Sequence, residues 1–296
     1  MTSSATVRVG TRASTLALTQ SGTVARAVAA AASLPDDAVE LVRIRTDGDR
    51  LTGSLASLGG AGVFVTTLRE ALLDGRCDLA VHSFKDLPTA PAPGLAVLAV
   101  PERVDPRDAL CARDGLTLEQ LPHGARVGTG SPRRAAQLRA ARPDLEIVDI
   151  RGNVDTRLGR VAGFARPGTA DPGDLDAVVL AAAGLARLGR LDRATEVLDP
   201  AVLCPAPGQG ALAVEVAETL DPATAAAVAT LDHLPTRLAV TAERSLLLTL
   251  EAGCSAPVGG LAHLDRLGSR LTLDAVVCQV DGGRSLRTSV SVEMPA

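Results

Sequence analysis

Lysine and the large aromatic residues are almost absent from this chain of 296 residues. It has no Trp, no Tyr and only three Phe, which argues against the aromatic stacking platforms of single-stranded nucleic-acid modules. A net charge of −4 does not favour a general binder of DNA or of anionic membranes. No run of about 18 apolar residues exists. We therefore expect neither nucleic acid nor a membrane as a partner.

Neither the cysteines nor the histidines follow a disulfide or metal-ligand pattern. The cysteines stand at positions 77, 111, 204, 254 and 278, an odd number without a Cys-x-x-Cys pair. This pattern argues against disulfides and a zinc ribbon. The four histidines are scattered without metal-ligand spacing, so no metal is expected. Reduced thiols, and the lack of a basic segment followed by an apolar stretch at the N-terminus, predict a cytoplasmic protein.

The single lysine, Lys85, contrasts with 29 arginines. A position that keeps Lys in such a chain is expected to need a compact ammonium rather than a planar guanidinium. Lys85 and Asp86 follow a predicted strand over 78–82, which places both charges at a strand's carboxyl end. Asp86 could stabilise a cationic intermediate there. The alternative is a surface pair of little energetic value.

Strand-like runs alternate with helical periodicity in the first half, which predicts a parallel α/β sheet. The predicted strands cover 7–11, 39–45, 78–82, 147–150 and 177–180, and the predicted helices cover 14–32, 64–73, 222–231 and 237–250. Two alternating runs, 271–280 and 285–292, flank a turn at 281–283 and indicate a third, α+β domain. The Gly- and Ser-rich stretch 47–62 predicts a loop, either a lid or a plain connection.

A strand–turn–helix unit is repeated. Arg8-Val9-Gly10-Thr11 returns as Arg126-Val127-Gly128-Thr129, and each copy leads to a serine that can cap a helix, Ser14 or Ser131. The repeat suggests two similar lobes. Ligands of open α/β sheets bind beyond the carboxyl ends of strands and against helix N-termini. The polar residues placed there are Thr11, Arg12, Ser14, Thr129, Ser131, Arg133 and Arg134.

Arginine is concentrated in residues 126–166, which hold nine arginines and four acidic residues. This local excess predicts a small, strongly anionic partner. Ligand candidates at strand–helix junctions are Arg133, Arg134, Arg151 and Arg157, whereas Arg139, Arg142, Arg160 and Arg166 are interpreted as a solvated face. No G-x-x-x-x-G-K-[ST] motif supports a nucleotide P-loop.

Cys254 follows a predicted helix end and a glycine, in a loop where a thiol is accessible enough to form a covalent bond. A cysteine peptidase would need a nearby His such as His263, and no family signature supports that function. Cys77 and Cys278 have apolar neighbours and are predicted to be buried.

Taken together, these stretches resemble the porphobilinogen deaminase (hydroxymethylbilane synthase) family. The similar stretches follow the family's order from residue 9 to about residue 260. They are 9–18, 80–88, Pro106-Arg107-Asp108-Ala109, 128–134, 151–158, Pro207-Gly208-Gln209-Gly210-Ala211 and 251–254.

The resemblance implies an α/β fold of two periplasmic-binding-protein-like lobes with mixed, mainly parallel sheets, and a small α+β C-terminal domain. The lobes are expected over 1–101 with 211–228 and over 107–204, and the third domain over 232–296. That domain is expected to be shorter than usual, because the chain stops at Ala296, before the family's final helices. The implied activity is a monomeric transferase that polymerises porphobilinogen head to tail, releases ammonia and gives hydroxymethylbilane for haem and other tetrapyrroles.

The resemblance also assigns roles to residues. Asp86 is the implied catalytic carboxylate, which stabilises the azafulvenium cation left when ammonia departs. A dipyrromethane cofactor is implied to be joined by a thioether to Cys254. The implied cofactor-binding residues are Ser83, Lys85, Thr129, Ser131, Arg133, Arg134 and Arg151, and the implied substrate-binding residues are Arg12, Ser14, Arg157 and Arg187.

Four positions depart from the family's pattern. Ser57 and Ala61 stand where two loop lysines are usual, Asp155 replaces a small residue, and Ala252 replaces a usual Gly. These departures leave a catalytically weakened paralogue as one alternative. A non-enzymatic two-lobed binder of a small polycarboxylate is another, and it would need neither Asp86 nor a modified Cys254. A transcription-regulator effector domain has no helix-turn-helix to support it.

Overall fold

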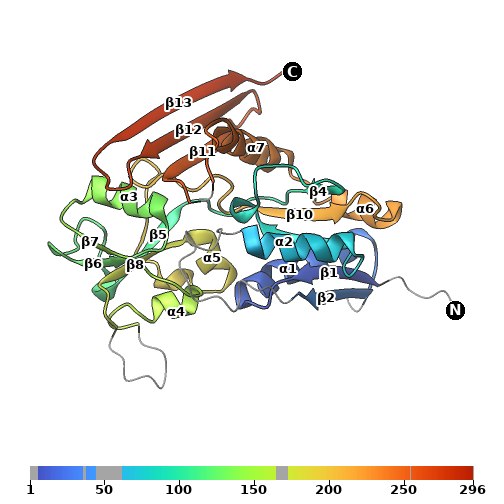
Figure 1. Cartoon of the computed structure of the whole chain (residues 1–296), viewed down its shortest axis with the longest axis horizontal. Coiled ribbons are helices and arrows are strands. Elements are labelled where there is room, and N and C mark those ends of the chain that lie inside the picture. The colour runs from blue at the N-terminus through green and yellow to red at the C-terminus, as the bar shows by residue number, and fades with distance from the viewer. Residues whose placement is uncertain (1–5, 36–37, 45–61, 165–172, 254, 296) are drawn as a thin grey trace. The chain divides into compact units, whose positions relative to one another are not determined.

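A computed structural model describes residues 6–35, 38–44, 62–164, 173–253 and 255–295 (Figure 1). The chain forms two compact units, Met1–Arg103 with Ala211–Thr241, and Val104–Gly210 with Ala242–Ala296. Apart from Gly62, the loop predicted over 47–62 lies outside the described residues, and so do Ser57 and Ala61. The boundaries predicted for three domains stay a prediction.

The first unit is built on a five-stranded sheet. In spatial order its strands are β2 (Val39–Arg43), β1 (Val7–Thr11), β3 (Leu79–Ser83), β10 (Leu212–Ala217) and β4 (Leu95–Ala99). β1 runs parallel to β2 and β3, whereas β10 runs antiparallel to both of its neighbours, β3 and β4. The helices of this unit are α1 (Thr15–Ala31), α2 (Gly62–Leu73), the one-turn 3-10 helix η3 (Phe84–Asp86) and α6 (Pro222–Ala229).

Side chains on the two faces of this sheet pack against different helices. Val81 of β3 belongs to a buried cluster with Val24 and Val28 of α1. Its neighbour in sequence, Ala80, belongs to another cluster with Leu68 of α2. Consecutive residues of a strand point to opposite faces of the sheet. Both faces are therefore covered, and the nearly continuous apolar run of β3 follows from burial on two sides.

The second unit repeats this architecture. Its sheet has the order β7 (Glu146–Val148), β6 (Arg126–Gly128), β8 (Ala177–Ala181), β5 (Asp108–Ala112) and β9 (Glu196–Val197). β6 runs parallel to β7 and β8, and β5 runs antiparallel to β8 and β9. The helices are α3 (Pro132–Ala141), α4 (Val154–Leu158) and α5 (Ala182–Arg187), with the 3-10 turns η4 (Arg113–Gly115) and η5 (Leu191–Arg193).

The two sheets confirm the expected fold class of mixed, mainly parallel α/β units. In each sheet, one strand runs against the other four. Strand–helix alternation in the first half predicted a parallel sheet, and β1, β2 and β3 confirm it, whereas the antiparallel β10 and β5 were not predicted as strands. Each of these strands inserts between two strands that are distant from it in sequence, so local periodicity carries no information about its direction.

The glycine of the repeated Arg-Val-Gly-Thr unit has a packing reason in both sheets. A Cβ atom on Gly10 would lie 2.7 Å from Sγ of Cys77, and one on Gly128 would lie 2.6 Å from Cδ1 of Leu175. Both distances are too short for any side chain. The repeat therefore preserves close packing beneath each strand end rather than a contact with a ligand.

A third, three-stranded sheet is formed near the C-terminus. Its strands β11 (Val258–Leu264), β12 (Arg270–Cys278) and β13 (Ser285–Glu293) form an antiparallel meander. The preceding helix α7 (Leu234–Thr249) contributes residues to both units. The predicted turn at 281–283 is confirmed, and the Gly283 N–H donates to Oδ1 of Asp281 at 2.9 Å. Helix α7 followed by this sheet gives the small α+β region that was expected.

A buried ion-pair cluster fastens α2 to the first sheet. Glu215 of β10 is only 2% exposed, and it accepts hydrogen bonds from Nε and NH2 of Arg69 at 3.0 and 2.8 Å. Nε2 of His82 lies 3.2 Å from the other carboxylate oxygen of Glu215. Burial by itself would raise the pKa of Glu215, but His82 and Arg69 outweigh it and lower that pKa. The carboxylate is therefore ionised at neutral pH.

Replacing Glu215 by Gln is expected to lower the free energy of unfolding by about 3 kcal/mol at pH 7, because it leaves the largely enclosed guanidinium of Arg69 without its counter-charge. The folded-state pKa of Glu215 is lowered. Its contribution is thus present above the unfolded-state pKa and is lost as the pH falls through the folded-state value. Urea denaturation should show the difference between variant and wild type shrinking in acid. Replacing the exposed Glu70, which follows Arg69 on α2, by Gln is the control, and an equal loss there would contradict the assignment.

Candidate functional site

The carboxyl end of β3 presents the chain's one lysine and a carboxylate on a single helical turn. Phe84 anchors this turn, since it is 7% exposed and its N–H donates to the Ala211 carbonyl at 3.0 Å. Lys85 and Asp86 follow on η3, and both are half-buried. Within the described parts of the chain, the Asp86 carboxylate makes no hydrogen bond or ion pair. The Asp86 side chain is therefore positioned by the backbone of η3 and not by a polar partner among the described residues.

The residues after β1 share this edge of the sheet. β1 and β3 are parallel neighbours, so their carboxyl ends meet at the same edge. Ser14 is confirmed as the N-cap of α1 and accepts from the Ala17 N–H at 3.3 Å. The Ser83 hydroxyl accepts from Nε2 of Gln20 at 3.2 Å. Of the predicted site residues, Arg12, Ser14, Ser83, Lys85 and Asp86 lie at or next to this edge.

The equivalent edge of the second sheet carries hydroxyls at the start of α3. Ser131 is confirmed as the N-cap of this helix, and Pro132 is its first residue. The Ser131 hydroxyl accepts from the Arg134 N–H at 3.5 Å, and the Thr129 hydroxyl accepts from the Ser131 N–H at 3.2 Å. Arg133 lies in the same first turn. Both arginines are buried, with exposed fractions of 4% and 5%, so neither belongs to a solvated helix face.

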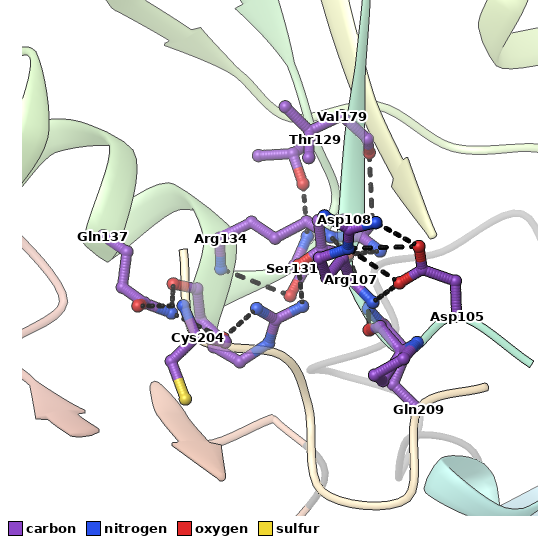
Figure 2. A network of polar contacts seen from close by, with 12 residues as sticks. Asp105, Arg107, Asp108, Thr129, Ser131, Arg134, Gln137, Val179, Cys204 and Gln209 are labelled. Carbon is purple, nitrogen blue, oxygen red and sulfur yellow. Dashed lines mark hydrogen bonds and ion pairs between the residues drawn. The ribbon is translucent and has the colours of Figure 1, made fainter. Parts of the chain in front are cut away.

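Asp108, which the sequence analysis did not single out as a site residue, pairs with both arginines; Asp108 and Arg134 are labelled in Figure 2. Oδ1 of Asp108 accepts from Nε and NH2 of Arg134 at 3.0 and 2.7 Å, and Oδ2 lies 2.8 Å from NH2 of Arg133. Burial opposes ionisation of Asp108, yet the two arginines and hydrogen bonds from Arg134 and Gln209 lower its pKa to about 2. In the sequence, only its place in the stretch Pro106-Arg107-Asp108-Ala109 could have identified Asp108 as a site residue.

Arg157 and Arg187 differ from that pair. Nε of Arg157 donates to the Gly152 carbonyl, and NH2 of Arg187 donates to the Gly210 carbonyl, both at 2.8 Å. Neither guanidinium pairs with a carboxylate of the described residues. Burial lowers the pKa of Arg187 to about 10, and burial with the charges of Arg134 and Arg151 lowers that of Arg157. These cations would be stabilised by an anion.

Several other charges of this region are paired within the protein. Asp155, which adds an unusual negative charge, lies 3.3 Å from Nε of Arg190. Arg142 pairs with Asp144, and Arg160 pairs with Asp174. Arg166 lies outside the described residues. Arg139 has no carboxylate partner among the described residues, and its NH1 donates to the Val280 carbonyl at 2.9 Å.

The thiols divide into two groups. Cys77, Cys111, Cys204 and Cys278 are free and buried, which confirms the predictions for Cys77 and Cys278. Burial raises the pKa of Cys77 and Cys204 to about 11 and that of Cys111 to about 12. The four are thus thiols rather than reactive thiolates. Cys254 lies outside the described residues, and Gly253 before it has open space around its Cα.

Two other kinds of site are absent from the described residues. They contain no group of three or more His, Cys, Asp or Glu side chains that could hold a metal ion. Nor does any helix in the described part of the chain combine the length and the apolar character that crossing a bilayer requires.

Comparison with known proteins gives a consistent result along the chain. Residues 7–225 match the family model "Porphobilinogen deaminase, dipyromethane cofactor binding domain", and residues 237–295 match "Porphobilinogen deaminase, C-terminal domain". A porphobilinogen deaminase of Cutibacterium acnes is 59% identical, over 98% of this chain and 88% of that protein. Those of Leifsonia xyli and Micrococcus luteus are 57% and 54% identical, over 96% and 97% of this chain and 83% and 82% of theirs.

Proposed function

The chain belongs to the porphobilinogen deaminase family, and we propose that it performs this family's reaction with Asp86 as its catalytic carboxylate. The enzyme is a transferase of tetrapyrrole biosynthesis. It joins porphobilinogen units head to tail, releases ammonia and yields hydroxymethylbilane. The observation that carries the assignment of Asp86 is its position, a carboxylate without an ion pair among the described residues, beside the only ammonium of the chain.

The charge of the substrate accounts for the arginines. Each pyrrole unit carries an acetate and a propionate, so the growing chain gains negative charge with every unit. Guanidinium groups bind carboxylates through two parallel hydrogen bonds. We assign substrate binding to Arg12, Ser14, Arg157 and Arg187. Arg157 and Arg187 support this assignment, because both are half-buried with lowered pKa values and neither forms an ion pair with a carboxylate of the described residues.

Loss of ammonia from porphobilinogen leaves an azafulvenium cation, and Asp86 stabilises it. Opposite charges about 4 Å apart gain on the order of 4 kcal/mol at an effective dielectric constant near 20. If this gain arises only as the cation forms, it corresponds to roughly a thousandfold in rate. The backbone of η3 holds the carboxylate before the charge develops, so little reorganisation is needed.

The dipyrromethane cofactor fits the second unit on chemical grounds. Its carboxylates need fixed donors, and Nε of Arg133 is a buried donor without a hydrogen-bond partner. The residues of this unit that would hold it are Thr129, Ser131, Arg133, Arg134 and Arg151. When bound, the cofactor supplies the primer to which the first substrate is joined. We assign its thioether to Cys254, because the other four thiols are buried with raised pKa values or packed in the core.

Incubating the purified chain with porphobilinogen tests the function directly. We expect ammonia and a linear tetrapyrrole to appear together in a fixed ratio, with the tetrapyrrole detected as porphyrin absorbance after cyclisation and oxidation. A chain that retains porphobilinogen through equilibrium dialysis without releasing ammonia would instead be a polycarboxylate binder. Slow but complete conversion would identify a weakened paralogue that still performs this chemistry.

A further inference from the structure

Two stretches of the sequence with no role so far meet at one buried carboxylate. Asp108 comes from Pro106-Arg107-Asp108-Ala109, and Gln209 comes from Pro207-Gly208-Gln209-Gly210-Ala211. Nε2 of Gln209 lies 2.8 Å from Oδ1 of Asp108 and also 2.8 Å from the Pro106 carbonyl oxygen (Figure 2). Both side chains are fully buried. The contact joins residues 101 positions apart, at the ligand edge of the second sheet.

The Asp108 carboxylate also forms ion pairs with two guanidinium groups. Arg134 turns its Nε and NH2 edge to Oδ1 of Asp108, and its NH1 donates to the Val179 carbonyl at 3.0 Å. Arg133 is held between Oδ2 of Asp108 and the Cys204 carbonyl, at 2.8 and 2.6 Å. With these atoms engaged, the directions of the remaining N–H groups are fixed. One negative charge also offsets half of the positive charge of the pair.

Stability of the fold is a weak explanation for this arrangement. A buried ion pair contributes little compared with apolar side chains of the same volume, because desolvation costs about as much as the attraction returns. A role in ligand binding explains the arrangement better than a role in stability. An enzyme that holds a growing polyacid must still release it, and binding that strengthens equally at every step does not raise turnover. Arg157 and Arg187 have no such counter-charge among the described residues.

We propose that Asp108 is a positioning residue that fixes the donors of Arg133 and Arg134 and limits how tightly the second unit holds acidic chains. The proposal depends on the proposed function. It divides the arginines into two kinds. The guanidinium groups of Arg133 and Arg134 are oriented and partly neutralised by Asp108, whereas those of Arg157 and Arg187 form no ion pair among the described residues. Gln209 holds the carboxylate between the two guanidinium groups.

Replacing Asp108 by Asn in the holoenzyme tests the proposal, because Asn keeps the shape and one acceptor but removes the charge. We expect the KM for porphobilinogen to fall roughly tenfold, the change that one charge-assisted hydrogen bond typically makes. We expect kcat to fall by at least as much, since release becomes slow. Intact mass spectrometry during turnover should show partly elongated chains accumulating on the protein. The salt dependence of KM should become steeper.

The matched control is Asp105→Asn. Asp105 also pairs with an arginine, Arg107, at 2.7 Å, but both side chains are more than a third exposed. Removing this charge should leave KM, kcat and salt dependence within about twofold of wild type. A folded Asp108→Asn enzyme whose KM is unchanged or raised would overturn the proposal.

A second variant decides the matter if Asp108→Asn does not fold. Gln209→Glu adds a negative charge to the same cluster and should act in the opposite direction, raising KM roughly tenfold and shortening the retention of intermediates. An unchanged KM in this variant would overturn the proposal. If the wild-type chain releases no ammonia from porphobilinogen, the proposed function fails. If it is active and both variants bind as wild type does, only the role of Asp108 fails.

Discussion

Replacing Asp86 by Asn is expected to reduce turnover of porphobilinogen by roughly a thousandfold, the factor that a gain of about 4 kcal/mol represents. The amide keeps the size of the side chain and can still hydrogen-bond, so substrate binding should change little. What is lost is the negative charge that opposes the azafulvenium cation. Single-turnover kinetics with porphobilinogen should show the loss in kcat rather than in KM.

The attached cofactor distinguishes this effect from unfolding. Intact mass spectrometry should show that Asp86→Asn still carries its dipyrromethane, because η3 is anchored by buried Phe84 and Leu87 and not by the carboxylate. Asp74→Asn, which changes an exposed carboxylate of the same unit, is the matched control and should turn over normally. A rate near that of wild type for Asp86→Asn would refute the catalytic role.

Replacing Cys254 by Ala is expected to remove both the covalent cofactor and the activity. A thioether requires sulfur, and no neighbouring thiol can substitute for it. The four described cysteines are buried, and thiols with raised pKa values are poor nucleophiles. The mass of the variant should match the sequence without an adduct, and an acid Ehrlich-type colour test for a dipyrrole should be negative.

Cys278→Ala provides the control for this experiment. Cys278 is 6% exposed and packs against Val276 and Cys204, so its loss should cost some stability but leave both the adduct and the colour reaction. An adduct that persists in Cys254→Ala would move the attachment to another residue. An adduct lost from Cys278→Ala in a folded chain would have the same meaning.

Local features of the sequence determined most of the elements that carry the site. Val7–Thr11 was predicted as a strand with the bounds that the structure shows. Ser14 and Ser131 were predicted as helix caps, and their hydroxyls accept from the first turns of α1 and α3. Strand alternation and capping are properties of a few consecutive residues. The sequence also indicated that Lys85 and Asp86 would stand at a strand's carboxyl end, where η3 places them.

The direction of β5 and β10 and the environment of Arg133 and Arg134 were decided by tertiary structure alone. β10 inserts beside β3 from more than a hundred residues away, and no local pattern encodes that pairing. Asp108 precedes Arg134 by 26 residues and Gln209 follows Asp108 by 101. An acid, an arginine pair and an amide become one network only when the sheet closes, because the energy of each contact depends on burial that the folded chain creates. The residue types of the site could thus be predicted from the sequence, whereas the pairing of their charges depends on the tertiary structure.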